Sequence, residues 1–322
     1  MNKTISEIKE IARRTIKTEA EIVSKLVSYV DDDFAGCVEL IYQSKARVVI
    51  TGVGKSAQIA GKIVATLNST GTPAIFMHAG DAVHGDLGII QKDDIIICIS
   101  NSGNTAEIKV LIPFIKMSGN KLIAMVGNRD SYLARQADFI IETTIEKEAC
   151  PNNLAPTSST TAQIVMGDAL AVSLLECRGF TTSDFAKFHP GGALGKRLYL
   201  RVADLYTQNE RPVVSLNQDI SSTIIEISSK RLGATAVMDG QKLAGMITDG
   251  DLRRMIQSGK LFDKVTAGDI MSKNPKTIEA ESLVVHALEI MRANNITQLL
   301  VTENGDYKGV IHLHDILKEG IL

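Results

Sequence analysis

The sequence predicts an α/β domain with a parallel sheet, followed by two copies of a smaller α+β unit. Over the first 200 residues, short apolar runs alternate with longer segments of helical spacing. This alternation is typical of buried parallel strands with helices on both faces of the sheet. Beyond residue 204 the chain repeats itself with a period of about 64 residues, which indicates two copies of one unit. We therefore expect domains at 1–200, 204–262 and 266–322.

The first domain is expected to begin with a long amphipathic helix and to continue with five strands. Apolar residues recur at mostly helical spacing from Ile5 to Leu26, so this helix should pack on the domain or on a second subunit. The apolar runs that predict buried strands lie at residues 48–50, 74–77, 95–99, 122–126 and 139–141.

The second half of the chain shows its repeat most clearly in two seven-residue segments. Residues 245–251 align with residues 309–315, and Pro212 aligns with Pro275. Each copy ends with an apolar strand, a turn and a helix that carries an acidic residue near its start. Two such copies resemble the paired cystathionine beta-synthase (CBS) domains, which pack as a pseudo-twofold pair.

The resemblance to CBS domains implies a nucleotide site. In that family, the Thr and Asp of a Gly-h-h-Thr-x-x-Asp motif contact the ribose and phosphate of adenosine-type ligands. The first copy keeps the pattern with Thr248 and Asp251, whereas the second has His312 in place of Thr. The alternative is that the pair serves only in packing or assembly, because fold alone does not settle function.

Composition narrows the class of protein. A net charge of -2 and the absence of a long basic run argue against nucleic acid as the main partner. No apolar stretch approaches the roughly 20 residues that a membrane helix needs, and residues 1–10 lack an apolar signal core. The four cysteines are widely spaced, without the pairing of a zinc or redox site. We expect a cytoplasmic protein with reduced thiols.

Two predicted strand-to-helix turns are rich in hydroxyl side chains. Residues 157–161 are five consecutive Ser and Thr before a helical segment, and residues 100–105 follow a predicted strand. Hydroxyls and free amides at a helix amino terminus bind phosphate well, so the sequence predicts a phosphorylated, polyhydroxylated ligand. The alternative is ordinary helix capping. The candidate substrate-binding residues here are Ser100, Ser102, Asn104, Thr105, Ser158, Ser159 and Thr160.

A glycine-rich turn at residues 51–56 has a composition similar to a P-loop, but its spacing is wrong. The P-loop needs a glycine where this chain has Val49. The turn instead presents Lys55 at the start of a helical segment, where it could neutralise a phosphate or an enediolate oxygen. The alternative is a solvated lysine.

Other polar segments carry candidate acid–base groups. Residues 78–86 hold His78, His84 and two aspartates between glycines, which suits either a metal site or a substrate loop. Glu148 and the glycine-flanked His189 could supply base and acid chemistry on a sugar. A single Glu or His is more often structural, so only the presence of both supports a catalytic role.

Together these motifs resemble the D-arabinose 5-phosphate isomerase family over essentially the whole chain. The resemblance implies a sugar isomerase (SIS) domain joined to a CBS pair. It also implies interconversion of D-ribulose 5-phosphate and D-arabinose 5-phosphate, which supplies Kdo synthesis for lipopolysaccharide. One departure is Asn104, where many members carry Glu. The motifs are Gly52-Val-Gly-Lys-Ser, His84-Gly-Asp-Leu-Gly, Ser102-Gly-x-Thr-x-Glu107, Glu148-Ala-Cys-Pro, residues 154–161 and His189-Pro-Gly-Gly.

The resemblance also implies roles for single residues. The catalytic set would be Lys55, Glu107, Glu148 and His189, with Gly71, Thr72 and His84 contacting substrate. Aldose–ketose isomerisation passes a proton between C1 and C2 through a cis-enediol, which needs a base, an acid and charge stabilisation but no redox cofactor. We expect Glu148 to be the base and Lys55 to stabilise the oxyanion. His189 would open the ring or exchange protons, and Glu107 would orient a partner or share proton transfer.

Further expectations concern metals, partners and rival functions. His78 could bind zinc as an inhibitory or accidental ligand, and no cofactor is required. SIS domains usually build their sites at subunit interfaces, so we expect a homotetramer in which His189 reaches a neighbouring site. A nucleotide or nucleotide sugar such as CMP-Kdo is a reasonable effector of the CBS pair. The alternatives are an isomerase of another sugar phosphate and a non-catalytic sugar-phosphate sensor.

Overall fold

The structure is a computed structural model that describes residues 3–259 and 264–321. It divides into two compact units, Met1–Phe188 and His189–Leu322. The first unit comprises α1 (Ile5–Leu26), η1 (Val27–Tyr29), α2 (Asp32–Gln43), β1 (Val48–Gly52), α3 (Lys55–Ser69), β2 (Ala74–His78), α4 (Ala79–Ala82), η2 (Asp86–Ile89), β3 (Ile95–Ser100), α5 (Ala106–Met117), β4 (Lys121–Val126), α6 (Tyr132–Gln136), β5 (Phe139–Glu142), α7 (Ser158–Cys177) and α8 (Thr182–Phe188).

The first unit is built on a five-stranded sheet in the order β2-β1-β3-β4-β5. All neighbouring strands pair in parallel, as the alternation of strands and helices predicts. The five apolar runs identified in the sequence each form one of these strands, which confirms the predicted fold class. Strands β1 and β3 are buried along their whole length, because they lie inside the sheet with helices over both faces.

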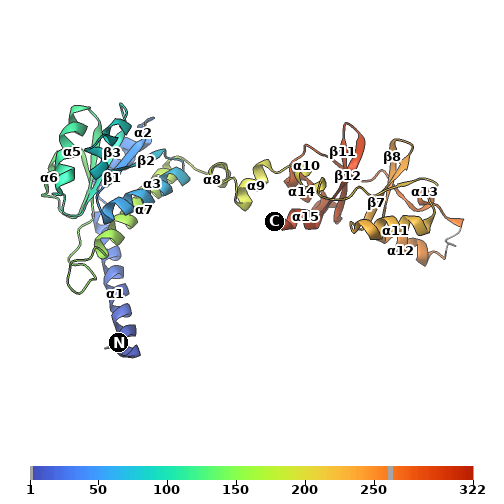
Figure 1. The fold of residues 1–322 in the computed structure, drawn as a ribbon, viewed down its shortest axis with the longest axis horizontal. Helices are drawn as coiled ribbons and strands as arrows, with labels where there is room; N and C mark the ends of the chain where they lie inside the picture. The colour runs from blue at the N-terminus through green and yellow to red at the C-terminus, as the bar shows by residue number, and fades with distance from the viewer. Residues whose placement is uncertain (1–2, 260–263, 322) are drawn as a thin grey trace. The chain divides into compact units, whose positions relative to one another are not determined.

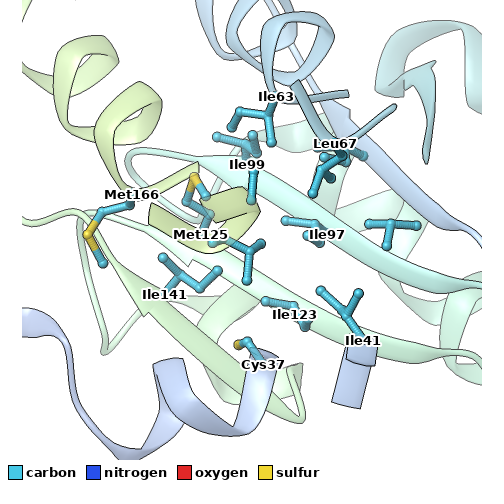
Figure 2. Close-up of a cluster of buried hydrophobic side chains, with 14 of the residues drawn as sticks. Cys37, Ile41, Ile63, Leu67, Ile97, Ile99, Ile123, Met125, Ile141 and Met166 are labelled. Atoms are coloured by element: carbon cyan, nitrogen blue, oxygen red, sulfur yellow. The ribbon is translucent and has the colours of Figure 1, made fainter. Parts of the chain in front are cut away.

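Alternate residues of the strands divide the interior into two cores. Ile97 and Ile99 of β3 face the layer formed by α2, α3, α7 and the end of α1, as Figure 2 shows in part. Ile96 and Cys98 face the layer formed by α4, α5 and α6. The alternation follows from the strand geometry, in which successive side chains point to opposite faces.

Helix α1 packs on the domain only near its carboxyl end. Leu26 is buried in the first core, whereas Ile5 is 75% exposed and Ile16 is 68% exposed. The amino-terminal part of the helix extends beyond the sheet domain (Figure 1). Its start is fixed by a reciprocal cap in which Glu7 and Thr4 bond to each other's amides. The sequence predicts that this helix packs on the domain or on a second subunit. In the structure, only its last turns pack on the domain.

The second unit contains the predicted repeat. Its elements are α9 (Ala193–Tyr199), α10 (Val202–Tyr206), β6 (Val213–Ser215), α11 (Ile220–Lys230), β7 (Ala234–Asp239), β8 (Lys242–Thr248), α12 (Asp249–Gln257), α13 (Ala267–Ile270), β9 (Ser272–Lys273), β10 (Thr277–Glu279), α14 (Val284–Asn294), β11 (Gln298–Glu303), β12 (Asp306–His312) and α15 (Leu313–Lys318). The series from α10 to α12 recurs as α13 to α15, with β9 added, so the repeat is a structural one. The sheets are ordered β6-β7-β8-β9 and β10-β11-β12.

The two copies share a hydrophobic cluster. Ala234 and Met246 of the first copy lie in it with Leu300 and Val310 of the second. Helix α9 is tied to the second copy, because the Lys196 ammonium lies 2.7 Å from the Glu319 carboxylate. This division places residues 189–200 with the second unit, whereas the sequence analysis assigned them to the first domain.

Within residues 3–259 and 264–321, no helix combines the length and apolar character needed to cross a membrane.

Helices α3 and α7 approach closely at Gly167, which gives a stability prediction. A methyl group at Gly167 would lie 2.4 Å from Cδ1 of Ile63, so Gly167→Ala should destabilise the chain by about 1–3 kcal/mol through overpacking. Gly61→Ala in α3 is the matched control, because nothing described lies within 4 Å of its added carbon. The control should be neutral or stabilising by up to about 1 kcal/mol. Denaturant unfolding measures both, and equal effects would contradict the close approach.

Candidate active site

The sheet has one point at which the chain changes winding direction, between β1 and β3. Helix α3 follows β1 and packs on the first core, and α5 follows β3 and packs on the second. The two connections therefore leave the adjacent strand ends toward opposite faces. In open α/β sheets, ligands bind in the crevice that forms at such a point.

A pocket of about 510 Å³ lies at this crevice, a size that suits a small molecule. It is bounded by the turn after β1, the turn after β3, the segment before α7 and the first turn of α7. Its lining includes Lys55, Ser56, Ser100, Asn101, Ser102, Thr105, Glu146, Lys147, Glu148, Asn153, Ser159 and Thr160. The structure thus brings Lys55, Glu148 and both predicted hydroxyl clusters to one place.

The turn after β3 is stabilised by hydrogen bonds from its own side chains. The Ser100 hydroxyl bonds to the Thr105 hydroxyl at 2.8 Å and accepts from the Gly103 amide at 3.1 Å. Gly103 has φ +61°, and a methyl group there would lie 2.0 Å from the Ser131 hydroxyl oxygen, so only glycine fits. Asn104 braces the same turn, because its side chain donates to the Ser102 carbonyl and accepts from the Tyr132 amide.

Lys55 occupies the first position of α3, against the preference set by the helix dipole. A cation there costs about 0.3–1 kcal/mol relative to the carboxyl end of a helix. Its side chain is exposed in the pocket lining, and no side chain caps the helix at Gly54. An anionic ligand in the pocket would contact both this ammonium and the free amides of α3. It would thereby offset the unfavourable interaction between the Lys55 cation and the helix dipole.

Glu148 caps the amino terminus of α7. Its Oε2 atom accepts from the amides of Thr157 at 2.8 Å and Ser159 at 3.2 Å, and from the Thr157 hydroxyl at 3.2 Å. Its Oε1 atom accepts from the Ser159 hydroxyl. The sequence predicts that residues 157–161 bind a phosphorylated ligand, whereas in this structure the donors of Thr157 and Ser159 bond to a carboxylate of the chain itself.

These contacts keep Glu148 ionised. Partial burial by itself raises the pKa of the carboxyl, but the hydrogen bonds from Ser159 and Thr157 outweigh burial and lower the pKa below its usual value. At neutral pH the group is a carboxylate, which is the form that a base requires.

Some other predicted residues lie near this pocket, and some do not. Glu107 is half-buried in the first turn of α5 and is not among the pocket-lining residues, and Ser158 is fully buried. Gly71 and Thr72 precede β2, at the amino edge of the parallel sheet, whereas the pocket lies at its carboxyl edge. Thr72 is 2% exposed. The structure of one chain therefore separates these two residues from the pocket.

The segment 78–86 forms no metal site by itself. Nδ1 of His78 lies 3.5 Å from the Asp81 carboxylate, and His84 is exposed outside the pocket lining. No group of three or more His, Cys, Asp or Glu side chains is placed to hold a metal ion in the part of the chain described. Zinc binding by His78, beside the Asp81 carboxylate, therefore stays a prediction. His189 belongs to the second compact unit.

Asn153 is a site residue that the sequence analysis missed. Its side-chain oxygen accepts from the Glu148 amide at 2.7 Å, and its backbone adopts φ +53°. It therefore holds the turn that brings Glu148 back onto α7. The available signal was the Cys-Pro-Asn-Asn run at 150–153, because Asn tolerates the left-handed conformation that such turns need.

The first copy of the repeat has a cavity at its predicted nucleotide motif. The cavity measures about 290 Å³ and is lined by residues of both copies, including Thr248, Asp251, Arg254 and Lys276. The Asp251 carboxylate accepts from the Thr248 hydroxyl at 2.7 Å and pairs with Arg254. Burial raises the pKa of Asp251, but these bonds lower it overall.

The equivalent space in the second copy is smaller, at about 120 Å³. The Asn209 side chain donates to the Asp315 carboxylate at 2.7 Å and to the Val310 carbonyl at 3.1 Å. The residue equivalent to Asn209 at the first copy's motif is Ser272, whose hydroxyl donates to the Asp251 carboxylate at 3.2 Å, so each motif carboxylate accepts a bond from this position. His312 stands where the first copy has Thr248, and its ring accepts from the His314 amide.

Comparison with known proteins decides the family. The chain is 48% identical to an arabinose 5-phosphate isomerase KdsD of Pseudomonas aeruginosa, over 97% of this chain and 96% of that protein. It is 41% identical to the KdsD of Escherichia coli K12, over 98% and 97%. The chain belongs to the arabinose 5-phosphate isomerase family.

Domain and structural matches agree with this family assignment. Residues 40–173 match the SIS domain model, and residues 267–321 match the CBS domain model. An E. coli CFT073 protein solved in complex with arabinose 5-phosphate is 39% identical, with a TM-score of 0.57, over 58% of this chain and 100% of that chain.

Proposed function

We propose that the protein is an aldose–ketose isomerase that interconverts D-ribulose 5-phosphate and D-arabinose 5-phosphate at the pocket of the first unit. The observation that carries this proposal is the convergence of an ionised carboxylate, a lysine and hydroxyl-lined helix starts on one pocket of about 510 Å³. The near-complete alignment with proteins named arabinose 5-phosphate isomerase supports the substrate.

The phosphate of the sugar is best received at the turn after β3. There the amides that begin α5 have no side-chain cap among the described residues, and Ser100, Ser102 and Thr105 of the preceding turn line the pocket. The corresponding position on α7 is filled by Glu148, so a phosphate there would face a carboxylate. This choice leaves Lys55 and Glu148 for the other end of the sugar.

The chemistry then follows from Glu148 and Lys55. The Glu148 carboxylate takes a proton from C1 of the ketose, and the electron pair of that C–H bond forms the C1=C2 bond of a cis-enediol. Negative charge that develops on O2 is stabilised by the Lys55 ammonium until the oxygen is protonated. Return of a proton to C2, with loss of the O1 proton, gives the aldose. Ketose and aldose have the same composition, so the reaction needs no oxidant.

The direct test is proton NMR of the purified protein with ribulose 5-phosphate and EDTA. We expect arabinose 5-phosphate signals to grow with time, because proton transfer by side chains needs no redox cofactor. An unchanged sugar spectrum with the sugar phosphate bound would identify a sensor. A different aldose as the product would identify an isomerase of another specificity.

The base role of Glu148 has its own test. In D2O, the parent protein should exchange the C2 proton of arabinose 5-phosphate for deuterium, and Glu148→Gln should slow that exchange by about 100-fold or more. The amide keeps the shape of the side chain but cannot accept the proton. Circular dichroism checks that the variant is folded. Exchange at the parental rate in the variant would exclude Glu148 as the base.

We further propose that the CBS pair binds one nucleotide-type effector per chain, at the cavity beside Thr248 and Asp251. Lys276 and Arg254 supply cations for its phosphate, and the equivalent space in the second copy is smaller.

Calorimetry of the full chain with AMP, ATP and CMP tests the effector site. One site per chain is expected, with binding weakened by about tenfold or more in Lys276→Ala, since a charged hydrogen bond is lost. Two sites per chain, or no binding of any nucleotide, would contradict the proposal.

The remaining expectations from the sequence belong to the same proposal. The product would supply Kdo synthesis for lipopolysaccharide in the cytoplasm, where free thiols are stable. A homotetramer would give α1 a partner, because its exposed Ile5 and Ile16 are costly in water. It would also allow Gly71, Thr72, His84 and His189 to reach the pocket of a neighbouring subunit.

A further inference from the structure

The amino terminus of α7 binds the Glu148 carboxylate. The Ser159 hydroxyl of that helix therefore bonds to Glu148. Ser159 is 1% exposed, and its hydroxyl donates to Oε1 of Glu148. A hydroxyl has one proton to donate. While that proton is shared with Glu148, Ser159 cannot donate to a sugar or a phosphate.

The charges around Ser159 also disfavour it as a phosphate ligand. A phosphate bonded to Ser159 would approach the Glu148 carboxylate, which takes the same amide and hydroxyl donors. Like charges in a partly buried site repel each other strongly. In the turn after β3, the hydroxyls of Ser100, Ser102 and Thr105 have no carboxylate bonded to them in the described part of the chain.

The two oxygens of Glu148 are held in different ways. Oε2 accepts from a hydroxyl and from two amides, which the helix backbone fixes in place. Oε1 accepts from the Ser159 hydroxyl, the sole partner that the structure describes for it. A carboxylate oxygen has two lone pairs, so Oε1 keeps one for a proton from substrate in the pocket that Glu148 and Ser159 line.

We propose that Ser159 is a positioning residue, which orients Oε1 of Glu148 toward the reacting carbon, and not a substrate ligand. This inference rests on the proposed role of Glu148 as the base. A hydroxyl suits the task because it can rotate. It donates to Oε1 while Glu148 is ionised, and it can turn away when Oε1 takes the proton. The lowered pKa of Glu148, to which the Ser159 hydrogen bonds contribute, agrees with this arrangement.

The first test is the kinetics of Ser159→Ala. Loss of the hydroxyl removes a bond to the ionised carboxylate, so the pKa of Glu148 rises and the acid limb of the kcat profile moves to higher pH. We expect kcat to fall about 10- to 100-fold while KM stays within about threefold, since the substrate does not touch Ser159. Ser173→Ala, which removes a hydroxyl from the carboxyl-terminal half of α7, away from the pocket lining, is the control and should leave the profile unchanged.

The second test is a double-mutant cycle with Glu148→Gln. If Ser159 acts through Glu148, Ser159→Ala should cost less than about twofold further in kcat in the Glu148→Gln background. Independent, multiplicative effects would overturn the proposal. So would a rise in KM with an unchanged pH profile, because that pattern belongs to a substrate ligand.

A third measurement does not depend on activity. Carboxyl NMR of 13C-glutamate-labelled protein without substrate follows the Glu148 signal, which Glu148→Gln identifies by its loss. Its titration should move to higher pH in Ser159→Ala, and an unmoved titration would overturn the proposal. Should the parent chain not isomerise ribulose 5-phosphate, the proposed function fails, and this titration still decides whether Ser159 controls Glu148.

Discussion

The pocket depends on one constraint, the opposite winding of the chain from two adjacent parallel strands. Strand β1 sends α3 to one face of the sheet and β3 sends α5 to the other, so the ends of the two strands remain uncovered. Parallel strands place their carboxyl ends at the same edge. The turns that follow them therefore meet, although they lie far apart in the sequence, and the segment before α7 closes the third side.

Helix amino termini supply much of the electrostatics of this pocket, and the chain uses them unequally. The start of α7 bonds to Glu148, whose carboxylate stays ionised in a partly buried place. Among the described residues, no side chain caps the starts of α3 and α5, which lie beside Lys55 and the Ser100–Thr105 turn. The amides at one helix start thus hold a carboxylate of the chain, and those at the other two have no such partner in the described chain.

The CBS pair shows how one repeated fold can carry unequal sites. Both copies keep the strand–turn–helix motif and its acidic residue, and both contribute to a shared cluster that includes Met246 and Leu300. Within the motif, His312 stands where the first copy has Thr248. Asn209 bonds to Asp315 and its equivalent Ser272 bonds to Asp251, and the space beside Asp251 is the larger of the two. The two sites therefore differ in side chains and in size although the fold repeats.

The five strands, the helical layers and the repeat could be predicted from the amino-acid sequence, because buried strands and amphipathic helices have short-range apolar patterns. The sequence also indicated that Lys55, Glu148 and the hydroxyl clusters act together. The cap that Glu148 makes on α7 is visible only in the folded chain, since that contact depends on a turn held by Asn153. The tertiary structure likewise placed Gly71 and Thr72 at the opposite sheet edge, because the direction of a strand, and not its composition, sets which end meets the pocket.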